Sequence, residues 1–320
     1  PSGPPPLLRL LGSLLAGRPR PGPADIAELD AAVEALSAET DPARIQLVGT
    51  AALVADRARG CREALWRLVA DGRAGGTVAG AVTALLVLTV DDVMTGEWTE
   101  AAELAREGVD RCDAHGYGTL RRPFRAAQAI LAAHRGDEAT CHAVVAELDE
   151  WAGARAVDAV RHYGRYAEAL AALAAGDAER AVRALVRINA PGTLPPGIPI
   201  AVWSGMDLVE AAVATGRRAE AGVHVAALRR AGLADLSPRL GMVVTAAAAL
   251  TASRPDAERL FTRALTIPGT ERWAFDRARI QLAFGEHLHR SRRPGPARAQ
   301  LGGALAAFHR LGARPWAARA

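Results

Sequence analysis

A turn recurs every 40 residues through the middle of this chain, each time between two alanine-rich stretches whose apolar residues have helical spacing. The turn glycines are Gly96, Gly136, Gly176 and Gly216, and Asp56 stands one period earlier. A fixed period of this size is typical of stacked supersecondary units rather than of one closed core. The repeat therefore predicts an all-α solenoid before any question of chemistry arises.

The repeating unit is predicted to be a helix hairpin. Apolar residues recur at helical spacing over Val157–Ala175 and again after Gly176. Glycine suits the left-handed conformation that ends a first helix, and a following acidic residue suits the positive start of a second. A small residue stands five positions after each turn, where it would let the two helices approach closely: Cys61, Ala101, Cys141, Ala181 and Ala221.

Two repeat classes compete for this pattern. The glycine turn followed by a small residue is the tetratricopeptide pattern, whose usual period is about 34 residues, whereas HEAT-type hairpins have a period nearer 40. The length favours HEAT and the turn chemistry favours tetratricopeptide. We follow the turn chemistry and predict a right-handed superhelical solenoid of tetratricopeptide-like hairpins with a period of about 40 residues.

The pattern extends over nearly the whole chain and predicts seven or eight hairpins. The expected helix pairs are Pro5–Gly17 with Ala24–Leu36, 41–55 with 57–71, 77–94 with 97–114, 121–134 with 137–151, 155–175 with 177–188, 200–215 with 217–231, 238–252 with 255–266, and 271–291 with 295–311. The stretch Asn189–Ile198 holds three prolines and two glycines, but the period runs through it. We therefore interpret it as a long loop within one repeat domain over residues 1–312.

Composition bounds the function. Half of the 320 residues are apolar, which is enough for a long continuous core. The chain has no lysine, so all 39 basic residues are arginine. Arginine matches phosphate oxygens, but these arginines are spread along the chain, and a GC-rich coding bias gives the same mixture. A net charge of +4 over this length is not a nucleic-acid signature.

The cysteines and termini indicate a cytoplasmic piece of a longer protein. Cys61, Cys112 and Cys141 are odd in number and lack CxxC spacing, so we expect buried thiols in a reducing compartment. The chain opens with neither a signal peptide nor an initiator methionine. The uncharged run Gly75–Val90 is shorter than the roughly 20 residues of a membrane span, so we interpret it as a buried first helix.

No motif in the chain supports catalysis or a cofactor. A phosphate-binding P-loop needs a lysine, and GxSxG and HExxH motifs are absent from the sequence. His287 and His289 are two apart and would point to different helix faces rather than toward one metal ion. Carboxylate pairs such as Asp91–Asp92 are expected to cap or end helices. We predict a protein that is not an enzyme and binds no metal.

The end of the chain resembles a known family. Arg277–Ala320 carries Leu311, Gly312, Ala313, Pro315, Trp316, Ala317, Arg319 and Ala320, and its preceding helix carries Arg277, Ala278, Arg279, Leu282, Gly285 and Leu288. This pattern resembles the final helix pair of the tetratricopeptide region in large LuxR-type transcriptional regulators of actinobacteria. In that family the motif leads into a helix-turn-helix, so the resemblance implies that residues 313–320 begin a linker toward one.

The resemblance implies a sensor and coupling domain for signal sensing in transcription regulation. Such a domain receives an inducer or protein partner and relieves autoinhibition of flanking ATPase and helix-turn-helix domains, both of which are absent here. Direct DNA binding by this chain and membrane association are not expected. The alternative is a generic tetratricopeptide scaffold, or adaptor, that mediates protein–protein interaction.

The repeat geometry also predicts which residues line the concave groove. First helices line that face of a hairpin stack, at positions about 13, 10 and 6 residues before each turn. The candidate groove residues are His134, Tyr163, Tyr166, Trp203, Met206 and Glu210. Aromatic rings with a few polar groups suit a ligand groove. The alternative is that these rings only pack between helices.

Overall fold

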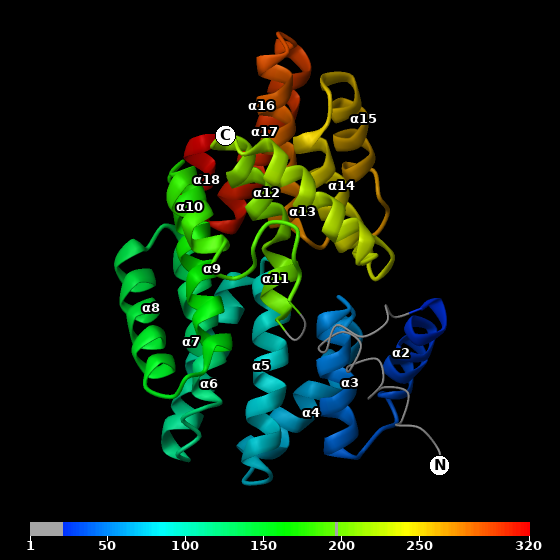
Figure 1. The fold of residues 1–320 in the computed structure, drawn as a ribbon. Coiled ribbons are helices and arrows are strands. Elements are labelled where there is room, and N and C mark those ends of the chain that lie inside the picture. The colour runs from blue at the N-terminus through cyan, green and yellow to red at the C-terminus, as the bar shows by residue number, and fades with distance from the viewer. Residues whose placement is uncertain (1–21, 196–197) are drawn as a thin grey trace. The chain divides into compact units, whose positions relative to one another are not determined.

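The computed structural model describes residues 22–195 and 198–320 (Figure 1). Of these residues 78% are helical and none lies in a strand, so the predicted all-α class is confirmed. The expected helix Pro5–Gly17 lies outside the described residues. Where the sequence predicts one domain over residues 1–312, contacts divide the chain into two compact units. Of the described residues, the first unit holds 22–128 with 198–199, and the second holds 129–195 with 200–320.

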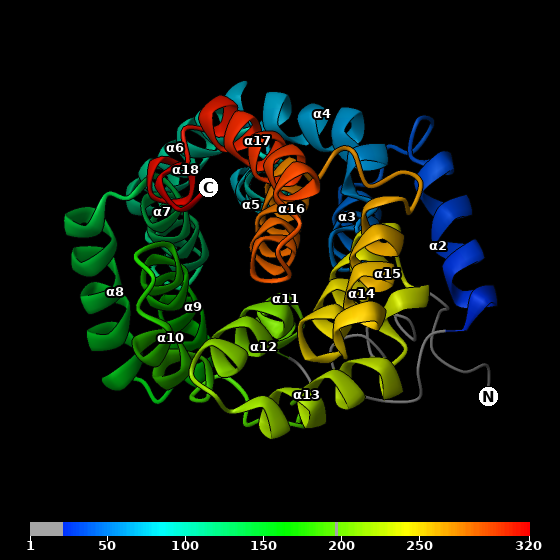
Figure 2. The ribbon, with the colours of Figure 1, turned by 90° about the horizontal axis from the view of Figure 1, so that it is seen from above.

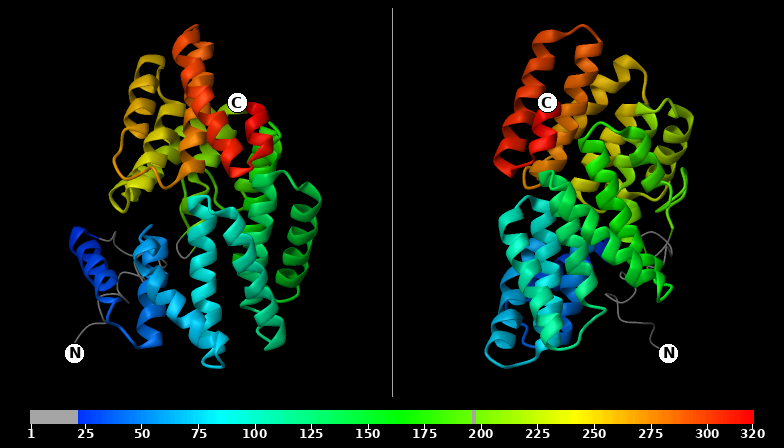
Figure 3. Two further views of the ribbon diagram at one scale, coloured as in Figure 1. Left: turned by 180° about the vertical axis from the view of Figure 1, so that it is seen from behind. Right: turned by 90° about the vertical axis from the view of Figure 1, so that its left-hand side faces the viewer.

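The first unit consists of successive helix pairs that pack on their neighbours, visible in cyan and blue in Figure 3. Its core is aliphatic, with Leu65, Leu85 and Leu88 fully buried and Phe124 closing one end. Its elements are α2 (Pro23–Ala35), α3 (Pro42–Val54), the 3-10 turn η1 (Ala58–Cys61), α4 (Arg62–Arg73), α5 (Val78–Thr95), α6 (Trp98–Ala114) and the first half of α7 (Arg121–Arg135).

Helix α5 is the apolar helix of this unit. Among the described residues it alone is long and apolar enough to cross a membrane, with a mean hydropathy of 1.7. Of its 18 residues 61% are buried inside the protein, as in the core helix of a folded domain. Asp91 and Asp92 do not end this helix as predicted. They lie within it, buried, because Arg62 of α4 forms ion pairs with both carboxylates.

The second unit continues the sequential pairing of helices (Figure 2). Within it, the first helices of successive hairpins also contact one another: α9 contacts α12, α12 contacts α14, and α14 contacts α16. Its elements are the end of α7, α8 (Glu138–Gly153), α9 (Asp158–Ala174), α10 (Ala178–Leu185), α11 (Pro199–Trp203), α12 (Gly205–Ala214), α13 (Arg218–Arg230), η2 (Leu233–Asp235), α14 (Pro238–Thr251), α15 (Arg254–Leu265), α16 (Ala274–Arg290), α17 (Pro294–Leu311) and α18 (Arg314–Arg319).

The predicted turns are present. Gly96, Gly136, Gly176 and Gly216 have φ of 94°, 79°, 76° and 79°, and Asp56 has φ of 59°. All five lie in the left-handed region, where a residue can end one helix and start the next. A second series of residues with left-handed backbone, which the sequence pattern did not predict, lies between successive hairpins. It includes Gly116, Ala156, Gly192 and Gly232.

The small residues after the turns are the close-packing positions. Cys61, Ala101, Cys141, Ala181 and Ala221 are all at most 1% exposed. Cys61, Cys112 and Cys141 are free thiols, as expected. Burial raises the pKa of Cys61 to about 12 and that of Cys141 to about 11, so these thiols stay protonated and pack as small apolar groups.

Two segments differ from the expected helices. The predicted helix 200–215 is divided at Ser204 into α11 and α12, where Gly205 lies so close to Leu228 that a Cβ would be 2.8 Å from its Cδ2. Within residues 313–320, which the sequence assigns to the start of a linker, Arg314–Arg319 form α18. This helix packs on α17 and α9, and its Trp316 is fully buried. The second unit therefore has its last helix packed against one of its earliest.

Candidate functional site

The six predicted groove residues all lie on helices of the second unit, with different degrees of exposure. Tyr163 and Tyr166 of α9 and Trp203 of α11 are half-buried. Met206 of α12 and His134 of α7 are only 4% and 5% exposed, so neither presents an open surface. Binding of a ligand at these six residues stays a prediction.

The structure brings some of the predicted residues together. The rings of Tyr163 and Trp203 meet edge to face, with centroids 6.4 Å apart. Tyr166 lies within the electrostatic reach of Asp207 and Arg279 and is desolvated, and burial followed by Asp207 raises its pKa well above the usual range. His134 packs edge to face on Phe275 of α16 at 4.3 Å.

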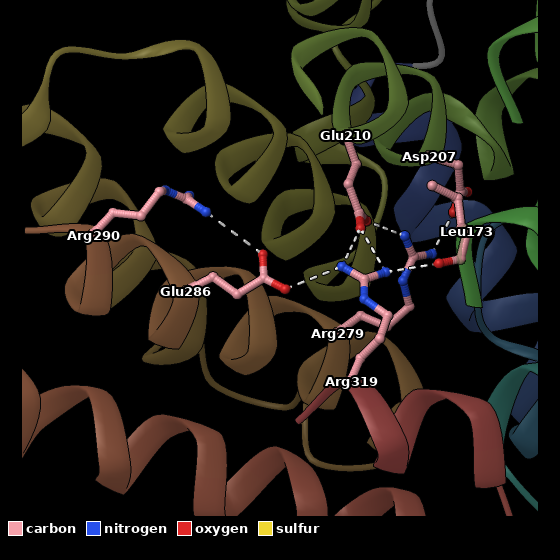
Figure 4. A network of polar contacts seen from close by, with 7 residues as sticks. All are labelled: Leu173, Asp207, Glu210, Arg279, Glu286, Arg290 and Arg319. Atoms are coloured by element: carbon pink, nitrogen blue, oxygen red, sulfur yellow. Dashed lines mark hydrogen bonds and ion pairs between the residues drawn. The ribbon is translucent and has the colours of Figure 1, made fainter. Parts of the chain in front are cut away.

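Arg279 of α16 is the centre of a buried charge cluster that the sequence did not predict. Its side chain is 5% exposed and forms ion pairs with Asp207 and Glu210 of α12 (Figure 4). Beside it, Arg239 of α14 donates to Asp276 of α16 across 2.7 Å. Charged side chains from three successive hairpins therefore meet on the contacting faces of their first helices.

Burial and pairing act in opposite directions on these carboxyl groups. Burial raises the pKa of Asp207 to about 6, although Arg279 opposes the shift. Burial also acts to raise the pKa of Glu210, but Arg279 and Arg319 together outweigh it and hold this pKa below its usual range. Arg279 itself stays charged, because its two acidic partners outweigh its desolvation. The cluster is thus a paired, largely neutralised set of charges.

The C-terminal helix α18 docks onto this cluster through Arg319. Its guanidinium donates to Leu173 O of α9 at 2.9 Å, to Glu210 of α12 at 3.2 Å and to Glu286 of α16 at 3.2 Å (Figure 4). One side chain therefore joins α18 to three first helices.

Trp316 adds an aromatic anchor to α18. Its ring lies between two cations, with the guanidinium carbons of Arg279 and Arg319 at 4.6 Å and 5.3 Å from the ring centroid. Phe275 meets it edge to face at 5.5 Å, and Phe308 lies at 6.1 Å. Cation–π contacts of this kind strengthen when the partners are desolvated.

Metal-binding clusters are absent from the described residues. No group of three or more His, Cys, Asp or Glu side chains in this part of the chain could hold a metal ion. The buried carboxylates of the cluster are paired with arginines. The arrangement joins α12, α16 and α18 through paired charges.

Comparison with known proteins does not assign a family. The sequence matches no protein-family model, and no curated protein matches it.

Proposed function

We propose that this chain is a non-catalytic sensor and coupling domain. An inducer or protein partner binds to the faces of the first helices, and its occupancy is passed to the C-terminal helix α18. This is the role that the tetratricopeptide region has in LuxR-type transcriptional regulators, which the C-terminal motif resembles. Its free, buried thiols are consistent with a cytoplasmic protein.

The observation that carries the proposal is the set of contacts made by Arg319. Its acceptors come from α9, α12 and α16, so any change in the spacing of these three helices alters the contacts that hold α18. Charge-assisted hydrogen bonds are strongly dependent on distance and direction, which makes them suitable reporters of small shifts. A ligand acts on α18 only if it favours one arrangement of these helices over another.

Coupling can be tested by changing the receiving face and observing α18. Replacing Glu210→Gln on α12 removes the charge that Arg319 and Arg279 share, and hydrogen exchange of the α18 amides should accelerate. Glu220→Gln on the exposed side of α13 is the matched control and should leave α18 exchange unchanged. Unchanged α18 exchange in Glu210→Gln would contradict the coupling.

The sensing role needs a ligand as well as a coupling path. A thermal-shift screen of fractionated metabolites should yield a compound that stabilises the protein and also changes exchange at α18. Ligands that bind the first helices without affecting α18 would favour the scaffold alternative. Reading the parent gene past the codon for Ala320 tests the regulator assignment, which requires a helix-turn-helix there.

A further inference from the structure

The second unit contains a pocket of about 460 Å³ at one end of three successive hairpins. It lies where the C-terminal ends of α12, α14 and α16 meet the starts of α13 and α15. Val213, Leu250 and Phe261 give it apolar walls. Its volume is within the range of roughly 300–1,000 Å³ that small-molecule sites occupy.

The charged residues around this pocket are mainly cations. Each of the three hairpins contributes one arginine: Arg218 from α13, Arg254 from α15 and Arg290 from α16. Glu286 is the one carboxylate among the lining residues. Three guanidinium groups and one carboxylate leave the lining with two positive charges in excess, which favours an anionic ligand.

The pocket also contains two polar atoms that lack a partner. His287 Nε2 and Ser291 Oγ are buried and have no hydrogen bond within the described part of the chain. Buried polar atoms in folded proteins almost always have a partner, so two such atoms in one pocket mark positions where a ligand can bind. The Ser291 hydroxyl can donate a hydrogen bond to an anion oxygen, and His287 Nε2 can donate one when the ring carries its hydrogen on that nitrogen.

We propose that this pocket binds a small phosphate monoester. A phosphomonoester carries about −1.5 to −2 charges at pH 7, close to the excess of the lining, and it has three acceptor oxygens. The arginines match these oxygens in geometry, Ser291 supplies a neutral donor, and the apolar wall at Phe261 contacts the organic part. A carboxylate has only one charge and would leave part of the excess unbalanced.

The pocket is connected to α18 by Glu286. This carboxylate lies 3.8 Å from Arg290 in the pocket and 3.2 Å from Arg319 of α18 (Figure 4). A phosphate on Arg290 competes with Glu286 and leaves that carboxylate more strongly paired with Arg319. Binding depends on the pocket alone, whereas this transmission to α18 rests on the proposed function.

The test is calorimetric titration at about 50 mM salt, where screening of these charges is weak. The probes are phenyl phosphate, inorganic phosphate, benzoate and phenol. Phenyl phosphate should bind saturably and at least about tenfold more tightly than the other three, because it alone offers both the dianion and the ring. Equal binding of benzoate, or of inorganic phosphate, would overturn the assignment to a phosphate monoester.

Two matched variants on one helix locate the site. Arg254→Gln removes an exposed pocket arginine and should weaken phenyl phosphate binding about tenfold or more. Arg259→Gln makes the same change on α15 outside the pocket and should have no effect. Equal affinities of these two variants for phenyl phosphate, or the absence of saturable binding to the wild type, would refute the proposal that this pocket binds a phosphate monoester. Phenyl phosphate that binds without slowing exchange at α18 would leave the site standing and contradict the proposed coupling.

Discussion

Replacing His134 with glutamine should make the protein less sensitive to acid. His134 is 5% exposed at the end of α7 and packs on Phe275. Burial, followed by the positive charges of Arg279 and Arg135, lowers its pKa from 6.5 to about 3. In the unfolded chain the ring regains its ordinary pKa and takes up a proton near pH 6.5.

The sign and size of the effect follow from this difference. Between pH 6.5 and pH 3 the unfolded state binds more protons at this position than the folded state, so the stability contribution is complete above pH 6.5 and is lost as the pH falls. Each pH unit in this window corresponds to about 1.4 kcal/mol, so His134 accounts for a loss of about 2 kcal/mol between pH 8 and pH 5. His134→Gln removes the titrating group and should abolish that part of the loss.

The measurement is urea unfolding at pH 8 and pH 5, followed by tryptophan fluorescence. The quantity compared is the change in unfolding free energy between the two pH values, so packing lost by the substitution cancels. Other titrating groups, including Asp207, are present in both proteins and cancel too. His289→Gln is the control, since His289 is exposed. An equal pH-dependent loss in wild type and His134→Gln would refute the assignment of a buried, neutral histidine.

Two further predictions concern side chains at particular positions, and a third concerns activity. Gly176→Ala places a Cβ in open space at φ 76° and should lower the free energy of unfolding by about 1 kcal/mol. Gly136→Ala, at φ 79°, places its Cβ 2.5 Å from Pro315 Cγ and should lower that free energy by at least about 1 kcal/mol more, measured by thermal unfolding. Trp316→Ala should destabilise the protein by about 3–5 kcal/mol because that ring is fully buried, and calorimetry should show a smaller loss for Trp203→Ala, whose ring is half-buried. The isolated chain should neither hydrolyse ATP nor bind a specific DNA sequence, and a measured ATPase activity abolished by a point mutation in this chain would contradict this expectation.

The hairpin pattern could be predicted from sequence because its causes are local. A left-handed turn residue, a small residue five positions later and helical apolar spacing all act within one repeat, so they can be read at Gly176 and Ala181 without knowledge of any other repeat. The same reasoning could have found the second left-handed series, since Gly116 and Ala156 are also one period apart.

The charge cluster could not be predicted in the same way. Arg279 pairs with carboxylates 72 and 69 residues away, and Arg319 donates to a carbonyl 146 residues away. No periodicity specifies which of 39 arginines meets which acid over such separations. The spacing of groove positions before each turn predicted Glu210 as a groove residue. Its arginine partners are visible only in the structure, where the first helices lie together. Aromatic residues are few, so local apolar patterning also gave no sign that the rings of His134, Phe275 and Phe308 would form one cluster with Trp316 of α18.

The residues that carry the C-terminal resemblance have identifiable packing roles. Gly312 takes a φ of 72° to end α17, Pro315 lies against Gly136, and Trp316 fills the aromatic cluster. Arg279 and Arg319 lie against this ring and share Glu210. The motif is thus a device for docking the last helix of the second unit onto its first helices. A domain attached after Ala320 would act first on Arg319, and through it on Glu210 and Glu286. Forces on the C-terminal end and changes in the spacing of the first helices would therefore meet at the same ion pairs, which is what the proposed coupling requires.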